Sequence, residues 1–155
     1  MIYRHILVAF DGSERAKLAL EQAVHMINER PVTRLTVLHV LHFPKLLIGG
    51  TLYLTPSAAE AEQQEFAEHM LYEARKMIEH LPYARIELRE GFPVDTILGF
   101  AEERGCDFIL MGSRGLKGIK KLLLGSVSGG VLEKAHIPVQ VVQHKQVPAI
   151  REMIL

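Results

Sequence analysis

The sequence predicts a doubly wound α/β fold, with a five-stranded, parallel, Rossmann-like sheet in the order 3-2-1-4-5 and helices on both faces. Two patterns predict this fold. Short apolar runs alternate along the chain with segments of helical periodicity. Most of these runs are continuously apolar, as is typical of strands that are buried on both faces. We expect a single domain over residues 1–155, with right-handed crossovers between the strands.

The first three elements are a strand at residues 5–9, a helix at 13–29 and a strand at 35–40. An apolar stripe at three- and four-residue spacing predicts this helix, and it consists of Ala16, Leu20, Ala23, Val24 and Ile27. Residues 42–56 mix apolar residues with glycines and prolines, which predicts a long variable loop. Such a loop could become ordered on a partner or over a bound ligand.

The next two elements are a helix at residues 57–81 and a strand at 84–88. The helix opens with Ser57 and Glu60, which have the spacing of a capping box. Its apolar stripe is predicted to consist of Phe66, Met70, Ala74, Met77 and Leu81. The strand alternates between apolar and polar residues, which favours a position at an edge of the sheet.

The last four elements are a helix at 93–104, a strand at 108–111, a helix at 126–135 and a strand at Val139–Val142. Pro93 in the first turn and Gly105 after the last residue are the expected ends of the third helix. The last strand is apolar and is expected at an edge, so we predict a homodimer through strand-five contacts. Residues 143–155 form a C-terminal tail, which packs on a neighbouring subunit or frays.

The composition argues against several classes of protein. The 18 basic and 18 acidic residues balance, so no overall field attracts nucleic acid or a membrane surface. No apolar run reaches the roughly eighteen residues of a membrane helix, and the first residues do not resemble a signal peptide. The single cysteine, Cys106, has the setting of a small buried residue rather than of a reactive thiol. We therefore expect a cytoplasmic protein without nucleic-acid or membrane partners.

Six of the twelve glycines lie in residues 111–132. Gly112 and Gly115 follow the fourth strand and can form a turn whose N–H groups bind an anion. Nine residues later, Gly125 and Ser126 start a helix, and a helix N-terminus attracts the same charge. The charged residues between Gly112 and Gly125 are all basic: Arg114, Lys117, Lys120 and Lys121. This spacing predicts phosphate binding. The alternative is ordinary turn glycines, a plain N-cap at Ser126 and a solvated lysine face.

Asp11 stands in the loop FDGS, directly after the first strand, where ligands bind in such sheets. Its carboxylate is suited to accept a ribose hydroxyl or to support a Mg²⁺ ion bound to phosphates. It would repel pyrophosphate, which disfavours an ATP pyrophosphatase. The structural alternative is that Asp11 is the N-cap of the first helix. His39 and His42 have no third ligand nearby in the sequence, so we predict no metal site made of side chains.

The spacing Gly112-x-x-Gly115, nine residues, then Gly125-Ser126 matches the motif G-x2-G-x9-G-[S/T]. The chain thereby resembles the ATP-binding branch of the universal stress protein family. The segments ILVAFDGS, CDFILMGSRG and PVQVV are also similar to that family. Only residues 42–56 and the tail fall outside the resemblance. It implies a cytoplasmic homodimer that binds ATP and acts in stress survival.

The resemblance also implies roles for individual residues. Asp11 and the backbone near Ala9 would meet ribose and adenine, and Val40 would face adenine. The other nucleotide-binding residues that it implies are Met111, Gly112, Arg114, Gly115, Gly125, Ser126, Val127 and Ser128.

No base that could activate water is evident in the sequence, so we expect no catalytic residues and favour binding over turnover. The prediction is a nucleotide-responsive regulatory protein with an unidentified protein partner. Its ligand would be ATP, or AMP or a cyclic nucleotide, together with Mg²⁺. Two alternatives stay open. One is a slow ATPase or phosphoryl-transfer enzyme, and the other is an interaction module that keeps the fold without using nucleotide.

Overall fold

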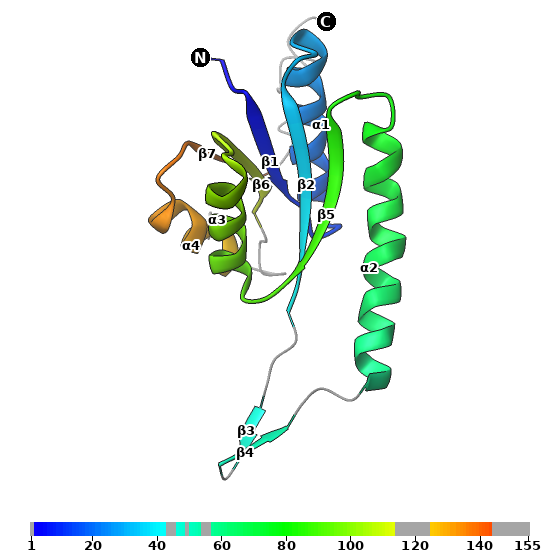
Figure 1. Cartoon of the computed structure of the whole chain (residues 1–155), viewed down its shortest axis with the longest axis vertical. Coiled ribbons are helices and arrows are strands. Elements are labelled where there is room, and N and C mark those ends of the chain that lie inside the picture. The colour runs from blue at the N-terminus through cyan, green and yellow to red at the C-terminus, as the bar shows by residue number, and fades with distance from the viewer. Residues whose placement is uncertain (1, 43–45, 49, 54–56, 114–124, 144–155) are drawn as a thin grey trace, which may run out of the picture.

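A computed structural model describes residues 2–42, 46–48, 50–53, 57–113 and 125–143 of the chain. A parallel sheet in the order β5-β2-β1-β6-β7 forms its centre (Figure 1). Its strands are β1 (His5–Ala9), β2 (Arg34–Leu41), β5 (Ala84–Glu90), β6 (Phe108–Gly112) and β7 (Val139–Val142). Numbered as the predicted strands, this order is 3-2-1-4-5, so the predicted topology is confirmed. The predicted edges, β5 and β7, are the two edges of this sheet.

Helices cover both faces of the sheet (Figure 1). α1 (Glu14–Glu29) and α2 (Ser57–Ile78) pack on one face, and α3 (Pro93–Arg104) and α4 (Ser126–Lys134) pack on the other. In β1, Ile6 and Val8 belong to the first apolar layer and Leu7 belongs to the second. A strand between two helical layers buries both of its faces, which explains its continuous apolar run. None of the described helices is long and apolar enough to cross a membrane.

The ends of α1 and α3 follow local rules. The Ser13 hydroxyl accepts a hydrogen bond from the backbone N–H of Ala16 at 3.1 Å, which makes Ser13 the N-cap of α1. Pro93 is the first residue of α3, and Gly105 ends it with a left-handed φ of 63°. Both ends of α3 are therefore as predicted. The side chain of Ser57, half of the expected capping box of α2, lies outside the described residues.

The predicted apolar stripe of α2 is wrong at its first position. Phe66 is 68% exposed, whereas its neighbour Ala67 is buried. Helical spacing that starts at residue 67 instead of 66 turns the buried face by one position. The residues of α2 and its C-terminal turn that are buried against the sheet are Ala67, Met70, Leu71, Ala74, Ile78 and Leu81. Met70, Ala74 and Leu81 were predicted to lie there, and Met77 is partly buried against the same layer.

Residues 42–56 contain more structure than the predicted loop. β3 (Leu46–Ile48) and β4 (Thr51–Tyr53) pair antiparallel, with Ile48 opposite Thr51 (Figure 1). A two-residue connection between apolar runs is the usual pattern of a hairpin. Gly50 has a φ of 79°, a conformation that glycine adopts without strain. The glycine pair in this segment was therefore a hairpin signal that the loop prediction overlooked.

Candidate functional site

The candidate site lies where the strand order reverses, at the carboxyl ends of β1 and β6. The chain leaves β1 toward α1 and β2 on one side, whereas β6 leads to α4 and β7 on the other. Ligands of open α/β sheets bind at such a switch point. Ala9 is the register partner of Met111, so the residues that follow the two strands meet at one edge of the sheet.

The loop after β1 fixes the position of Asp11. Phe10 is buried, and its N–H donates to the carbonyl of Leu38 at 2.8 Å. One carboxylate oxygen of Asp11 accepts a hydrogen bond from the N–H of Ser13 at 3.0 Å. Because Ser13 is the N-cap of α1, the alternative that Asp11 holds that position is wrong. Asp11 instead closes a short turn before the helix, with its carboxylate half-buried at the switch point.

Four apolar residues of the implied nucleotide site lie in one layer, although only Ala9 and Val40 were assigned to adenine and Val127 was assigned to the phosphates. Ala9, Val40, Met111 and Val127 all belong to the apolar layer between the sheet and α3 and α4. Met111 is buried, and the other three are partly buried against that layer. They come from β1, β2, β6 and the first turn of α4, so the fold brings together residues that are up to 118 positions apart in the sequence. Val40 also lines the hollow beside the end of β2, so among these four it is the residue that the structure shows next to open space.

Gly112 is a glycine for a reason that the sequence does not reveal. A Cβ at this position would lie 2.5 Å from the backbone nitrogen of Ala16 and 2.6 Å from the carbonyl carbon of Arg15. The first turn of α1 therefore packs directly on the end of β6. Arg15 adds a further link, since its guanidinium donates to the carbonyl of Ser113 at 2.8 Å and to its hydroxyl at 3.3 Å. Something does lie against this backbone, and it is α1.

Arg15 was missed by sequence reasoning. It stands in the first turn of α1 and places a half-buried guanidinium beside the residue that follows β6. Its position after FDGS was the available signal, because the first turn of the first helix starts at the switch point. Its charge adds a cation close to the edge where the anion site was predicted.

The N-terminus of α4 has no side-chain cap among the described residues. Gly125 is its N-cap and offers no side-chain hydrogen bond, so the alternative that Ser126 is the N-cap is wrong. The first helical hydrogen bond runs from Gly129 N–H to the Gly125 carbonyl at 2.8 Å. The N–H groups of Ser126, Val127 and Ser128 therefore precede the first bonded turn. Three donors at the positive end of a helix are suited to a phosphate.

The two serines of α4 differ in what their hydroxyls can do. Ser128 is buried, and its hydroxyl donates to the Gly125 carbonyl at 3.1 Å. It can therefore reach a ligand through its N–H group rather than through its side chain. Ser126 is exposed at the first position of the helix. Arg114 and Gly115, with Lys117, Lys120 and Lys121, lie outside the described residues, so the predicted anion nest after β6 stays a prediction.

The two histidines at the end of β2 bind main-chain carbonyls. His39 Nδ1 lies 2.7 Å from the Phe10 oxygen, and His42 Nδ1 lies 3.3 Å from the Gly91 oxygen. Both contacts require the nitrogen to donate, which removes it as a metal ligand. Within the described ranges, no three His, Cys, Asp or Glu side chains are grouped so that they could hold a metal ion. A hollow of about 290 Å³ adjoins these histidines and Val40, between the end of β2 and α2.

Cys106 lies at the opposite end of the sheet and is 6% exposed. Burial raises the pKa of its thiol to about 11, so almost no thiolate forms near neutral pH. The prediction of a small buried residue is confirmed.

Comparison with known proteins points to one family. Its model, described as the universal stress protein family, matches residues 2–143. Universal stress protein MJ0531 of Methanocaldococcus jannaschii is 34% identical over 148 residues, which cover 92% of this chain and 83% of the relative. Universal stress protein YxiE of Bacillus subtilis is 31% identical over 152 residues, which cover 92% of this chain and all of the relative. The solved universal stress protein from Archaeoglobus fulgidus in complex with dAMP is also similar. It has a TM-score of 0.63 at 28% identity and covers 92% of this chain and 99% of that one.

Proposed function

The chain belongs to the universal stress protein family, and from this membership we propose that it binds an adenine nucleotide and acts as a regulatory protein in stress survival. The ligand that we propose is ATP with Mg²⁺, and the assembly is a cytoplasmic homodimer. The relative from Archaeoglobus fulgidus that was solved with dAMP supports an adenine nucleotide as the class of ligand.

One observation carries the proposal. Three features that suit different parts of a nucleotide meet where the strand order reverses. Val40, which is partly buried and lines the hollow beside the end of β2, suits a base. The Asp11 carboxylate suits a ribose hydroxyl. The N-terminus of α4 at Ser126, which has no side-chain cap among the described residues, suits phosphates. Few small ligands combine an apolar ring, a hydroxylated linker and an anion in that order, and nucleotides are among them.

The described residues also fit a Mg²⁺ ion that arrives with ATP. Asp11 supplies carboxylate oxygens and Ser126 an exposed hydroxyl, and both are of the oxygen type that Mg²⁺ prefers. When bound, the ion would neutralise phosphate charge next to the Asp11 carboxylate. Without it, that carboxylate would repel a triphosphate, so we expect ATP to bind more tightly with Mg²⁺ than without it.

The first test asks whether the purified protein carries a nucleotide. The protein is denatured, and the released small molecules are identified by mass spectrometry. The proposal expects ATP, ADP or AMP at a substantial fraction of the protein concentration, or saturable ATP binding after the protein has been stripped. A stripped protein that binds no adenine nucleotide at millimolar concentration would favour the interaction module that does not use nucleotide.

The second test separates binding from catalysis. ATP and Mg²⁺ are incubated with an excess of protein, and the product ADP is followed over time. We expect the nucleotide to persist for many minutes, because the Asp11 carboxylate is bonded to the Ser13 N–H and is assigned to ribose or Mg²⁺ rather than to an attacking water. Turnover at about one per second or faster would establish the enzyme alternative.

A further inference from the structure

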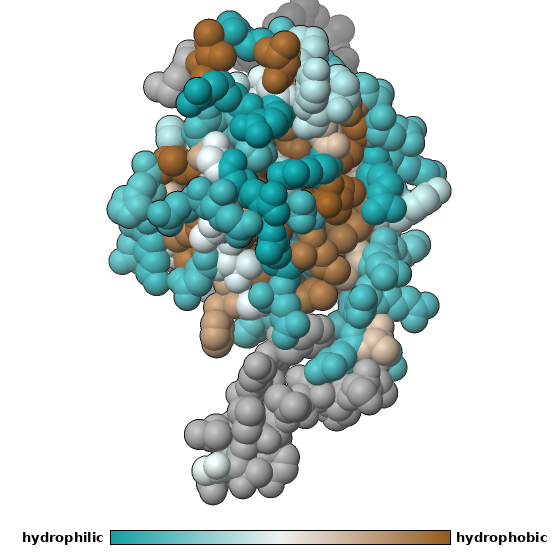
Figure 2. Space-filling model, viewed as in Figure 1, coloured by the Kyte–Doolittle hydropathy of each residue, from teal (hydrophilic) through white to brown (hydrophobic). Residues whose placement is uncertain are grey.

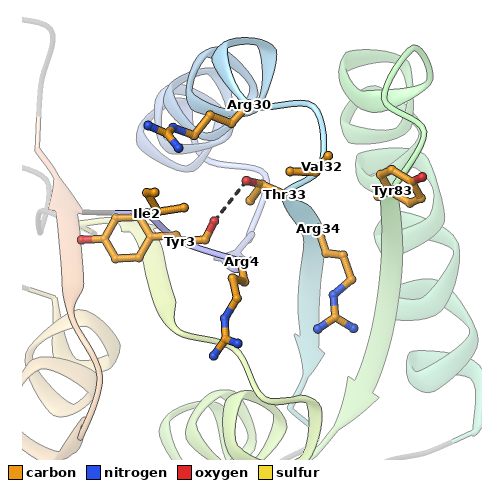
Figure 3. A pocket seen from close by; sticks show the side chains of 8 residues that line it. All are labelled: Ile2, Tyr3, Arg4, Arg30, Val32, Thr33, Arg34 and Tyr83. Atoms are coloured by element: carbon orange, nitrogen blue, oxygen red, sulfur yellow. Dashed lines mark hydrogen bonds between the residues drawn. The ribbon is translucent and has the colours of Figure 1, made fainter.

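A second hollow lies at the end of the sheet that is opposite to the proposed nucleotide site. It has a volume of about 500 Å³ and is formed where β1, β2 and β5 begin (Figure 3). Its lining residues come from the residues before β1, the α1–β2 connection, the first residue of β2 and the residue before β5: Ile2, Tyr3, Arg4, Arg30, Val32, Thr33, Arg34 and Tyr83. This volume is within the range of sites that bind small molecules or single side chains, about 300–1,000 Å³.

The walls of this hollow are unusually apolar for exposed surface. Ile2 is 63% exposed, Val32 is 83% exposed and Tyr83 is 59% exposed. Each is a large hydrophobic side chain, and they gather here from three separate segments. Figure 2 shows apolar beside strongly polar surface at the upper end of the molecule, where β1 begins and the connections enter β2 and β5. Grouped apolar exposure of this kind marks an interaction site more often than scattered exposure does.

The charged lining is basic. Arg4, Arg30 and Arg34 contribute cations, and no acidic residue lines the hollow. Arg4 is ion-paired with Asp107 at 3.8 Å. Arg30 and Arg34 make no ion pair with any residue that the structure describes. Arg4 and Arg34 extend in the same direction from neighbouring strands (Figure 3), and the Arg34 N–H donates to the Arg4 carbonyl. Paired arginines can bind carboxylates with two hydrogen bonds each.

The floor of the hollow is ordered by internal contacts. The Thr33 hydroxyl donates to the Tyr3 carbonyl at 3.1 Å, which is the bond drawn in Figure 3. The Tyr3 ring stacks on Phe108 with centroids 4.0 Å apart. The floor of the hollow is therefore anchored to the folded core, whereas its walls are exposed side chains. An ordered floor lowers the entropic cost of binding a ligand.

From these features we propose that this hollow is a docking site for an acidic peptide segment of a partner protein, with a bulky apolar side chain that enters it. The apolar side chain contacts Val32 and Tyr83, and flanking carboxylates pair with Arg30 and Arg34. A concave site suits a peptide side chain better than the flat surface of a membrane. The chain's net charge of zero offers no wider field for nucleic acid. Because the two sites lie at opposite ends of the sheet, a partner can dock while the nucleotide is bound.

The test uses a fluorescein-labelled, end-capped heptapeptide with phenylalanine at its centre and aspartate or glutamate elsewhere. Its binding to the full chain is followed by fluorescence anisotropy. One control peptide has every acid replaced by its amide, and a second has the phenylalanine replaced by glycine. We expect saturable binding of the first peptide and at least about fivefold weaker binding of each control, since each loses one of the two complementary features.

Protein variants locate the binding. Arg34→Gln and Val32→Ser should each weaken binding about fivefold, and neither should unfold the chain because both side chains are exposed. Arg75→Gln is the matched control, since it removes the same charge from the exposed face of α2 and should leave the affinity unchanged. Equal losses in Arg34→Gln and Arg75→Gln would overturn the proposal.

Two further outcomes also decide the proposal. Equally tight binding of the amide peptide and the acidic peptide would overturn the role of the arginines. Vesicles of phosphatidylserine in phosphatidylcholine serve as the membrane arm. Arg34-dependent binding to these vesicles, together with no peptide binding, would replace the peptide by an anionic lipid surface. The nucleotide proposal is untouched by any of these results, because none of the variants lies at the carboxyl ends of the strands.

Discussion

Single residues decide how the site is built, and Gly112 shows that one glycine can be explained in two ways. The sequence pattern attributes it to a phosphate that approaches the backbone. In the structure, α1 itself occupies the space into which a Cβ would project. The two explanations do not exclude each other, since the packing of α1 accounts for this glycine whether or not a phosphate also binds nearby. They differ in what a substitution does when no ligand is present.

We therefore expect Gly112→Ala to destabilise the protein without nucleotide by about 1–3 kcal/mol, the usual cost of overpacking. The added Cβ would meet backbone atoms of Arg15 and Ala16, which cannot rotate away. Gly99→Ala is the matched control. It lies in α3 with no atom within 4 Å of the new Cβ, and it should stabilise the helix by about 0.5–1 kcal/mol. Urea unfolding of both variants measures the difference, and equal effects would contradict this account of Gly112.

Asp11→Asn separates the structural and the binding roles of that residue. Asparagine keeps a side-chain oxygen for the Ser13 N–H, so we expect little change in melting temperature without nucleotide. It loses the charge that strengthens a hydrogen bond from ribose, so ATP affinity should fall about tenfold. Calorimetric titration of the variant and the wild type measures the ATP affinity. Asp95→Asn, an exposed acid in the first turn of α3, is the control that should bind ATP like the wild type.

His5 makes stability depend on pH. Its Nε2 lies 2.9 Å from the Thr36 hydroxyl and its Nδ1 lies 3.2 Å from the Arg104 carbonyl, and the ring is buried. Burial lowers the pKa of His5 below its ordinary value of 6.5. The unfolded chain therefore takes up the proton first. The contribution of the neutral ring is fully present above pH 6.5 and is lost as the pH falls toward the folded pKa.

We expect the free energy of unfolding of the wild type to decrease over the pH interval that begins at about 6.5 and extends down to the lowered pKa of His5. His5→Asn should be less stable at pH 7.5 and should show a flatter dependence over this interval. His80→Gln, a change at an exposed histidine after α2, is the control that should keep the slope of the wild type. Urea titrations at several pH values provide the measurement. Identical slopes for wild type and His5→Asn would exclude the buried ring as their source.

At the scale of elements, the predictions succeeded where burial imposes a pattern. The strands β1 and β7 were predicted to the residue, because strands in parallel sheets need apolar residues on both faces. The predicted apolar stripe of α2 was wrong at Phe66, because a long helix with many polar residues has two neighbouring stripes of similar hydrophobicity. The hairpin of β3 and β4 was overlooked because three-residue strands carry too short a pattern.

The residues of the candidate site likewise fall into those that the sequence predicted and those that it did not. Asp11, Gly112, Gly125 and Ser126 were assigned to one end of the sheet because parallel strands share their carboxyl ends. Arg15 was not, because its contact with Ser113 depends on how α1 packs over β6, which no local pattern encodes. The hydrogen bond from the Ser128 hydroxyl to the Gly125 carbonyl is likewise evident only in the three-dimensional structure.

The edge strand β7 carries the prediction of a dimer. The carbonyls of Pro138 and Val142 accept hydrogen bonds from β6, so Gln140 faces β6 as well, whereas Val139 and Val141 direct their backbone groups to the open edge. Val141→Pro should therefore remove a donor from the dimer interface without breaking the sheet. We expect the wild type to sediment as a dimer at micromolar concentration and Val141→Pro as a folded monomer. A wild-type monomer would contradict the dimer.

At the scale of the whole molecule, the two ends of the sheet have different chemistry. The carboxyl ends of the strands carry an acid, the apolar Val40 beside a hollow and a helix N-terminus without a side-chain cap, which suit a nucleotide. The amino ends of β1 and β2 combine arginines with exposed apolar side chains, which suit a protein segment. The rigid sheet between them separates the two surfaces. A regulatory protein needs such a separation if it is to bind ligand and partner at the same time.

Hydrogen exchange with and without saturating ATP and Mg²⁺ is the decisive measurement for the nucleotide site, because it locates the ligand on the chain. We expect slower exchange at the N–H groups of Ser126, Val127 and Ser128 and in the loop from Phe10 to Ser13. Amides near Thr33 and Cys106, at the opposite end of the sheet, should be unchanged. Unaltered exchange at the start of α4, under conditions where ATP is bound, would contradict the nucleotide site described for this fold.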